Sequence, residues 1–119
     1  MANELQVPIN PITFIKGSSN VTLPAKVNSI TVSGKHYVRK TQTIGTTDET
    51  LDLGDIGTIG VVVLTNQDAT NYILIGPDGS SYPIRLKPGE GFPFRWNGAA
   101  IHAKANSAPC DLEQLIVED

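Results

Sequence analysis

The chain is poor in the residues that build disulfides, metal sites and active sites. It has one cysteine and two histidines in 119 residues, so no disulfide can form within it, and a zinc site would have to be assembled wholly by the fold. Cys110 follows Pro109, where we expect a half-buried thiol at the start of a strand rather than a nucleophile. His36 and His102 each lack a second ligand at metal-binding spacing. We therefore predict no catalytic residue, no metal and no cofactor.

Long apolar runs and catalytic motifs are also missing. No stretch is long enough to span a bilayer, and the segment around Glu4 lacks the basic and apolar regions of a signal peptide. There is no phosphate-binding glycine loop, no GxSxG and no HExxH. The densest acidic cluster, at residues 48–55, does not match the spacing of an EF-hand, and a solvated loop is favoured over a calcium site. We expect a soluble, non-enzymatic protein without membrane contact.

Acidic residues are absent from one long stretch of the chain. Residues 6–47 contain no Asp or Glu, whereas from Asp48 onward eleven acidic residues face four basic ones. The basic residues of that stretch, which we take as candidate partner-binding residues, are Lys16, Lys26, Lys35, Arg39 and Lys40. Either this segment lies against the acidic remainder of the same monomer, or the asymmetry is accidental, or it docks on an acidic neighbouring subunit. A net charge of −3 without a dense basic tract argues against nucleic acid as the main partner.

Short strand-like runs separated by turns fill the second half of the chain. We expect antiparallel strands at residues 61–64, 72–75, 82–86, 91–96, 100–105 and 111–117. The continuous β-branched run at 61–64 predicts a strand buried on both faces. Gly76-Pro77-Asp78-Gly79 has strong turn chemistry, and no segment keeps a helical period. The fold class predicted is all-β, an antiparallel β-sandwich or jelly-roll-like barrel with an extended N-terminal arm.

Prolines and polar alternation set the expected organisation of the first half. Pro8, Pro11 and Pro24 keep residues 1–24 out of central strand positions, which predicts the N-terminal arm. Residues 25–119 form the predicted sandwich domain. Residues 27–33 and 36–44 flank a tight connection at Gly34 and Lys35, so we predict a peripheral hairpin over residues 25–46.

A row of aromatic residues and one turn are compatible with other functions. Phe92, Phe94 and Trp96 alternate along one strand and share a face, which we interpret as core, with a carbohydrate platform as the alternative. The turn in RLKPGEG is similar to one in cupins, a family of β-helix metal enzymes. Cupin metal sites need a His-x-His pair, which this chain lacks.

The arrangement of FIKGSSNV, SGKHYV, IRLKPGEGFPFRW and a closing AKANSAPCDLEQLIVED resembles a group of small structural proteins encoded by tailed bacteriophages. The resemblance covers most of the chain, rests on strand and turn patterns, and carries over no functional residues. It implies a virion component, assembled in the host cytoplasm, most simply a capsid decoration (cement) protein.

Such a protein would bind the major capsid protein as a homo-oligomer, with a trimer favoured. The alternative is a tail-associated or receptor-binding accessory protein with a carbohydrate-binding surface. Because the predicted last strand finishes at the end of the chain, we also expect Glu118 and Asp119 to be free to meet a basic neighbour.

Overall fold

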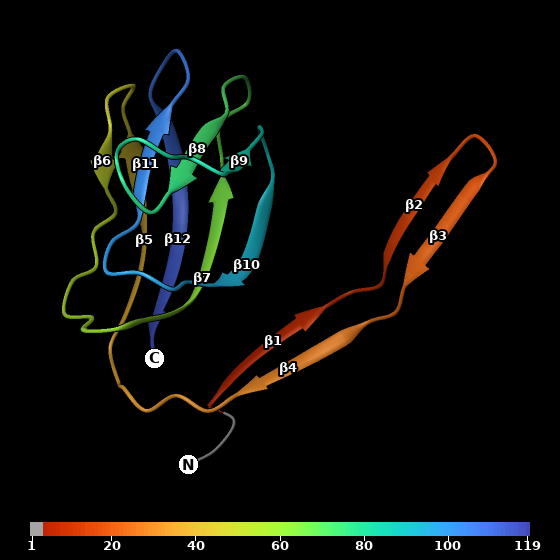
Figure 1. Cartoon of the computed structure of the whole chain (residues 1–119), viewed down its shortest axis with the longest axis horizontal. Helices are drawn as coiled ribbons and strands as arrows, with labels where there is room; N and C mark the ends of the chain where they lie inside the picture. The colour runs from red at the N-terminus through yellow and green to blue at the C-terminus, as the bar shows by residue number, and fades with distance from the viewer. Residues whose placement is uncertain (1–3) are drawn as a thin grey trace. The chain divides into compact units, whose positions relative to one another are not determined.

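The computed structural model describes residues 4–119, and these form antiparallel β-sheets without a helix (Figure 1). Their contacts divide the chain into two compact units, Met1–Ser33 and Gly34–Asp119, which we call the ribbon unit and the body. The strands are β1 (Leu5–Ile9), β2 (Ile12–Lys16), β3 (Ser19–Leu23), β4 (Lys26–Ile30), β5 (Tyr37–Ile44), β6 (Glu49–Thr50), β7 (Ile59–Asn66), β8 (Ile73–Gly76), β9 (Ile84–Leu86), β10 (Gly91–Arg95), β11 (His102–Ala105) and β12 (Cys110–Glu118). Residues 4–119 contain no helix that is long and apolar enough to cross a membrane.

The body contains two antiparallel sheets that share one hydrophobic core. Sheet 1 has the strand order β10-β7-β12-β5, and sheet 2 has the order β6-β11-β8-β9 (Figure 1). Alternate residues of β12 point into the core, where Cys110, Leu112 and Ile116 are at most 1% exposed. Ile73 and Ile75 of β8 join the same cluster from sheet 2. The expectation of an all-β, antiparallel fold is confirmed.

The strands predicted in the second half are all present. β7 matches the expected doubly buried strand in its first part, since Val61 is 6% exposed on one face and Val62 is fully buried on the other. Cys110 begins β12 as predicted, but it is buried rather than half-buried. Burial raises the pKa of its thiol, which makes this cysteine a poor nucleophile.

The ribbon unit is one long two-stranded ribbon with a break near its middle. β1 pairs with β4, and β2 pairs with β3. The register is the same on both sides of the break, so Pro11 and Pro24 lie across from each other. Neither proline has an N–H to donate to the ladder, and the strand pairing is interrupted there. Gly17, at a φ of 58°, turns the chain at the tip.

The predicted hairpin over residues 25–46 is wrong. β4 pairs with β1 in the ribbon unit, whereas β5 pairs with β12 in the body. The connection at Gly34 and Lys35 therefore joins two units rather than two paired strands, and the predicted boundary after residue 24 falls inside the ribbon unit. Alternation along β5 identified a strand, but it did not identify its partner, which lies far away in the sequence.

A buried asparagine closes one end of the core. Asn66, at the end of β7, is fully buried. Its Nδ2 donates to Asn71 O and to Leu86 O, both at 2.9 Å, and its Oδ1 accepts from Asp68 N at 2.9 Å. Each hydrogen-bonding atom of the side chain is therefore satisfied, and the side chain fastens the β7–β8 loop to β9.

Replacing Asn66 by aspartate should destabilise the body strongly. Asn66→Asp keeps the shape but places a carboxylate oxygen against two carbonyl oxygens, and a buried charge without donors is costly. We expect a loss of about 3 kcal/mol in the free energy of unfolding, measured by urea titration of Trp96 fluorescence. Asn97→Asp, at an exposed position of the body, should change this free energy by less than about 0.5 kcal/mol. Equal losses in the two variants would contradict this account.

Candidate functional site

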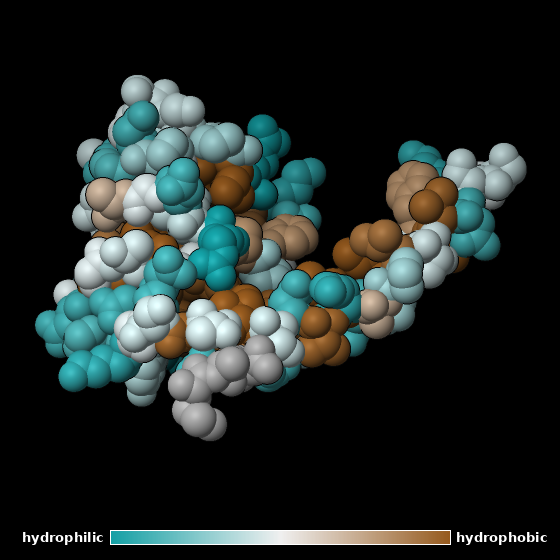
Figure 2. All heavy atoms as spheres, turned by 60° about the horizontal axis from the view of Figure 1, so that its bottom comes forward, coloured by the Kyte–Doolittle hydropathy of each residue, from teal (hydrophilic) through white to brown (hydrophobic). Residues whose placement is uncertain are grey.

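Apolar side chains collect on one face of the β2–β3 hairpin. The register places Ile12 opposite Leu23 and Phe14 opposite Val21, so all four share a face. Their exposed fractions lie between 54% and 63%, and Figure 2 shows brown, hydrophobic side chains along this hairpin. We call these four residues the ribbon face. Among residues 4–119 no third strand pairs with the hairpin, and a two-stranded hairpin is marginally stable in water by itself.

The opposite face of the hairpin is mixed in character. It carries Thr13, Asn20 and Thr22, together with Ile15, which is 70% exposed. Lys16 is the only charged residue between positions 10 and 25. The hairpin is therefore amphipathic and nearly uncharged, which is typical of a surface that packs against another protein. The alternation of Ile12, Thr13 and Phe14 in β2 is a signal for this face that the sequence already contains.

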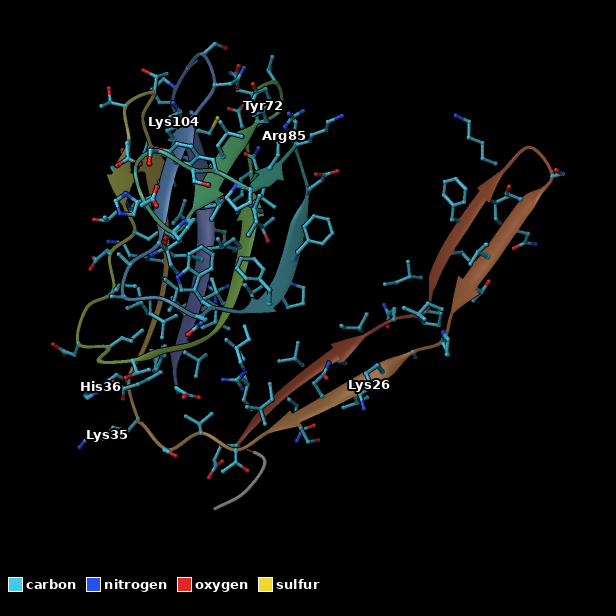
Figure 3. All side chains as sticks on the ribbon, viewed as in Figure 1. Lys26, Lys35, His36, Tyr72, Arg85 and Lys104 are labelled. Atoms are coloured by element: carbon cyan, nitrogen blue, oxygen red, sulfur yellow. The ribbon has the colours of Figure 1, made fainter. Side chains whose placement is uncertain are left out.

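The five predicted partner-binding cations do not form one set. Lys16 and Lys26 belong to the ribbon unit, whereas Lys35, Arg39 and Lys40 belong to the body; Figure 3 labels Lys26 and Lys35. Within the body, Arg39 Nη2 lies 3.6 Å from Glu113 Oε2, and Lys40 Nζ lies 2.9 Å from Asp52 Oδ2. For Arg39 and Lys40 the structure therefore favours pairing within the monomer.

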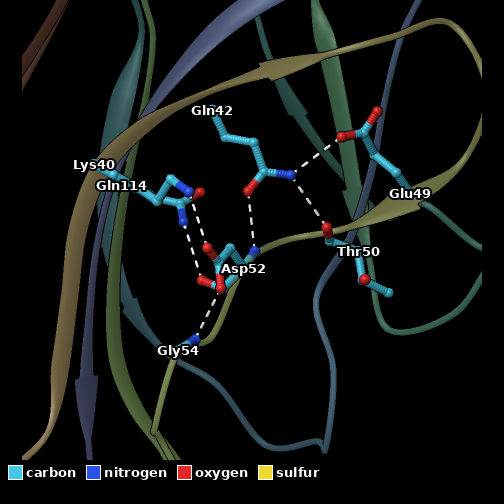
Figure 4. Close-up of polar contacts among 7 residues, drawn as sticks. All are labelled: Lys40, Gln42, Glu49, Thr50, Asp52, Gly54 and Gln114. Atoms are coloured by element: carbon cyan, nitrogen blue, oxygen red, sulfur yellow. Dashed lines mark hydrogen bonds and ion pairs between the residues drawn. The ribbon is translucent and has the colours of Figure 1, made fainter.

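Lys40 belongs to a network that fastens the loop after β6 (Figure 4). Gln42 Nε2 donates to Thr50 O at 3.1 Å, and Gln42 Oε1 accepts from Asp52 N at 2.9 Å. Asp52 also accepts from Gly54 N at 2.9 Å, and the Lys40 and Gly54 bonds lower its pKa. The carboxylates of this region serve the fold, and residues 4–119 contain no group of three His, Cys, Asp or Glu side chains placed to hold a metal ion.

Glu118 fastens the segment that enters the body to the end of β12. A bulge between Ile116 and Glu118 shifts the register with β7, and bulges re-aim the side chains that follow them. Glu118 Oε2 accepts from Gly57 N at 2.6 Å, and Oε1 accepts from Lys35 N at 3.0 Å and lies 3.0 Å from His36 Nδ1. The backbone bonds from Gly57 and Lys35, more than His36, lower the pKa of Glu118 to about 2.

The expectation that the last two residues are free is wrong. Glu118 is held by the bonds described above, and Asp119 Oδ1 accepts from Arg95 Nη1 at 2.9 Å. Asp119 O also accepts from Gly34 N at 2.9 Å. Both carboxylates therefore have partners within the body, which proximity to the end of the chain did not indicate.

A second polar cluster joins Asp48, Tyr82 and His102. Asp48 accepts a hydrogen bond from the Tyr82 hydroxyl and lies 2.9 Å from His102 Nδ1. These contacts lower the pKa of Asp48 and raise the pKa of Tyr82 to about 12, and the Tyr82 hydrogen bond is the largest cause of both shifts. Lys104 Nζ lies 5.1 Å from the centre of the Tyr82 ring. The polar atoms of these groups form hydrogen bonds with one another. Among residues 4–119, their hydrogen-bond partners include no serine, threonine or cysteine that could act as a nucleophile. We therefore interpret the cluster as a structural brace.

A groove of about 530 Å³ runs beside the end of β10. Its lining includes Arg95, Trp96, Asn97 and Asp119. Trp96 packs against the core and donates its Nε1 hydrogen to Ala100 O at 3.0 Å.

The aromatic face predicted as core is therefore correct in part. Phe94, with its ring centre 5.9 Å from that of Trp96, also packs against the core. Phe92 shares their face but lies on the edge strand and is 51% exposed.

Glu118→Gln should remove a pH-dependent part of the stability. Because the pKa of folded Glu118 lies near 2, below its ordinary 4.5, its contribution is present above pH 4.5 and is lost as the pH falls towards 2. We expect the variant to unfold at lower urea than wild type at pH 7, with the difference disappearing near pH 2. Glu113→Gln, whose partner Arg39 is 64% exposed, should change little at either pH. A constant difference between pH 7 and pH 2 would refute this role of Glu118.

No protein-family model, curated protein or solved structure matches the chain. The candidate site is therefore identified from the geometry of residues 4–119. Of the surfaces described among residues 4–119, the ribbon face is the one that consists of apolar side chains more than half exposed. It is therefore the main candidate site.

Proposed function

We propose that this chain is a non-enzymatic structural subunit that assembles into a larger particle through the ribbon face. The observation that carries the proposal is the exposure of Ile12, Phe14, Val21 and Leu23 on a hairpin of two strands. Contiguous apolar surface that is exposed to water is typical of protein interaction sites. A hairpin that is marginal alone gains its stability from the surface that covers it.

The body is, in this proposal, a β-sandwich of jelly-roll-like form, and the ribbon unit is its docking arm. Support comes from the two four-stranded sheets described in the body, which fill one core. The arm extends to Ser33 rather than to residue 24, because β4 pairs with β1. Its net excess of positive charge, from Lys16 and Lys26 against Glu4, favours an acidic neighbour.

The particle we propose is the virion of a tailed bacteriophage, with the chain as a capsid decoration (cement) protein that binds the major capsid protein as a homotrimer. The resemblance of the strand and turn patterns to small phage structural proteins supports this assignment. A small arm makes only a weak contact by itself. On a symmetric lattice many such contacts form together, and each one raises the effective local concentration of the binding partners at the next.

Removing the ribbon unit should separate folding from assembly. All the buried apolar residues identified among residues 4–119 lie in the body, so a chain of residues 34–119 should keep its thermal midpoint within about 5 °C of the full chain. The same chain should fail to cosediment with capsids assembled from the major capsid protein of the same phage.

The two measurements have separate meanings. Equal capsid binding by the full and shortened chains would contradict the proposal that the arm docks on the capsid. Failure of the full chain to bind capsids would remove the cement assignment.

A carbohydrate-binding accessory protein is the second candidate, favoured by the groove beside Trp96. Arg95, Asn97 and Asp119 surround the indole with donors and acceptors, and such groups beside an aromatic ring suit a sugar. Trp96 is the only tryptophan, so a change in tryptophan fluorescence of the folded protein comes from the surroundings of this one residue. If the chain is a cement protein, glycans of the host cell surface should leave this fluorescence unchanged. A saturable change, absent in Asn97→Ala, would favour the receptor-binding function instead.

A further inference from the structure

The outer face of sheet 1 contains a hollow. Glu113 and Leu115 of β12 point away from the core, in register with Thr65 and Val63 of β7. A hollow of about 170 Å³ opens at these positions. Its lining consists of Arg39, Val63, Thr65, Glu113, Gln114 and Leu115. The hollow is apolar at Val63 and Leu115 and charged at its rim.

A glycine lies opposite Thr65, one of the residues that line this hollow. Gly91 of β10 lies opposite Thr65, so that row of the outer face ends without a side chain. A Cβ at this position would collide with the Thr65 side chain. The neighbouring row continues onto Pro93, opposite Val63. Position 91 therefore adds no side chain next to Thr65 on this face of the sheet.

We propose that this hollow receives Phe14 of a second copy of the chain, and that Lys16 of the same ribbon pairs with Glu113. The inference rests on the proposed assembly function and assigns Phe14 and Lys16 to the contact between copies in the homotrimer rather than to the contact with the capsid protein. Phe14 is 57% exposed. A cavity of about 150 Å³ is large enough for a benzene ring, so the hollow has room for the phenyl group.

The spacing of apolar and charged residues is the same on the two surfaces. Phe14 and Lys16 are two residues apart on one face of β2, and Leu115 and Glu113 are two residues apart on the outer face of β12. Residues at this spacing lie about 6.6 Å apart on any strand. A ribbon that lies with β2 antiparallel to β12 and places Phe14 over Leu115 therefore brings Lys16 over Glu113.

Glu113 can accept this second cation. Its side chain is 39% exposed, and its distance of 3.6 Å from Arg39 Nη2 is long for an ion pair. Arg39 itself is 64% exposed. A complementary charge beside an aromatic anchor fixes the register of a contact more than its strength.

Both halves of this contact belong to one chain, which is why a second copy is the occupant. The contact is head-to-tail, so each copy offers one ribbon and one hollow, and repetition around an axis closes a ring such as the proposed trimer. A single contact of one aromatic anchor is well below the roughly 800 Å² per partner of a stable complex, so closure of the ring must supply much of the stability.

Two variants of the full chain disable the two halves separately. Phe14→Thr removes the anchor and keeps strand propensity. Thr65→Phe fills the hollow with a ring that lies across from Gly91, a cross-strand pair that strands tolerate well. Sedimentation equilibrium at about 100 μM should show a concentration-dependent oligomer for wild type and at least about a tenfold weaker association for either variant. The matched control is Ile15→Thr, on the opposite face of the hairpin, which should associate as wild type does.

Mixing the two variants tests the head-to-tail geometry. The Phe14→Thr chain keeps an open hollow, and the Thr65→Phe chain keeps an intact ribbon, so the mixture should form nothing larger than a one-to-one dimer, which is held by a single contact and is weaker than the wild-type ring. A short bismaleimide should also join a Lys16→Cys chain, which keeps the Phe14 anchor, to a Thr65→Cys chain, whose position 65 lies opposite Glu113, but should not join an Ile15→Cys chain to it. The native Cys110 is 1% exposed, so we expect it not to react with the maleimide.

Three results would overturn the inference: a monomeric wild type, equal weakening by Ile15→Thr and Phe14→Thr, or a crosslink to position 65 that is no stronger from the ribbon-face cysteine than from the Ile15→Cys control. Each leaves the assembly function separately testable. A monomeric full chain that binds capsids through its ribbon would keep the proposed function and reject this contact. A ring with the expected variant behaviour that ignores capsids would do the reverse.

Discussion

One strand, β12, holds the body together. It lies between β5 and β7 in sheet 1, so it joins the segment that enters the body to the first core strand. Its inward residues, such as Leu112 and Ile116, fill the core, and its outward residues Glu113 and Leu115 line the hollow. The bulge near its end directs Glu118 to the backbone of the entering segment. The core, the outer surface and the anchor of the chain's entry therefore depend on the pairing of this strand.

The ribbon unit is governed by a different constraint, because two strands cannot bury their own side chains. In the body, a second sheet covers the inward face of β7 and leaves Leu64 fully buried. In the β2–β3 hairpin the same kind of alternation leaves Phe14 and Val21 more than half exposed. Apolar surface that no layer covers has a large free energy to gain from association. This difference between the units is the reason why we propose the ribbon as an interaction element.

Local signals predicted the parts of the fold that local chemistry controls. Turns such as Gly76-Pro77-Asp78-Gly79 separate the core strands, because proline and glycine impose their backbone geometry wherever they occur. Pairing over long distances was not predictable, and the hairpin expected around Gly34 and Lys35 was wrong for that reason. The same limit applies to the sites: Asp48 meets Tyr82 and His102 across 34 and 54 positions, and no spacing rule connects them.

The sequence by itself determined that this protein is all-β, that its second half supplies the core strands and that prolines keep the N-terminal segment from a central position. These follow from periodicity and turn residues, which act within a few positions. Only the tertiary structure decided which strands pair, that Arg39, Lys40, Glu118 and Asp119 have partners within the body, and that the ribbon face stays exposed. Burial and charge pairing depend on which residues the fold brings near each side chain. Distances between residues far apart in the chain cannot be read from the sequence alone.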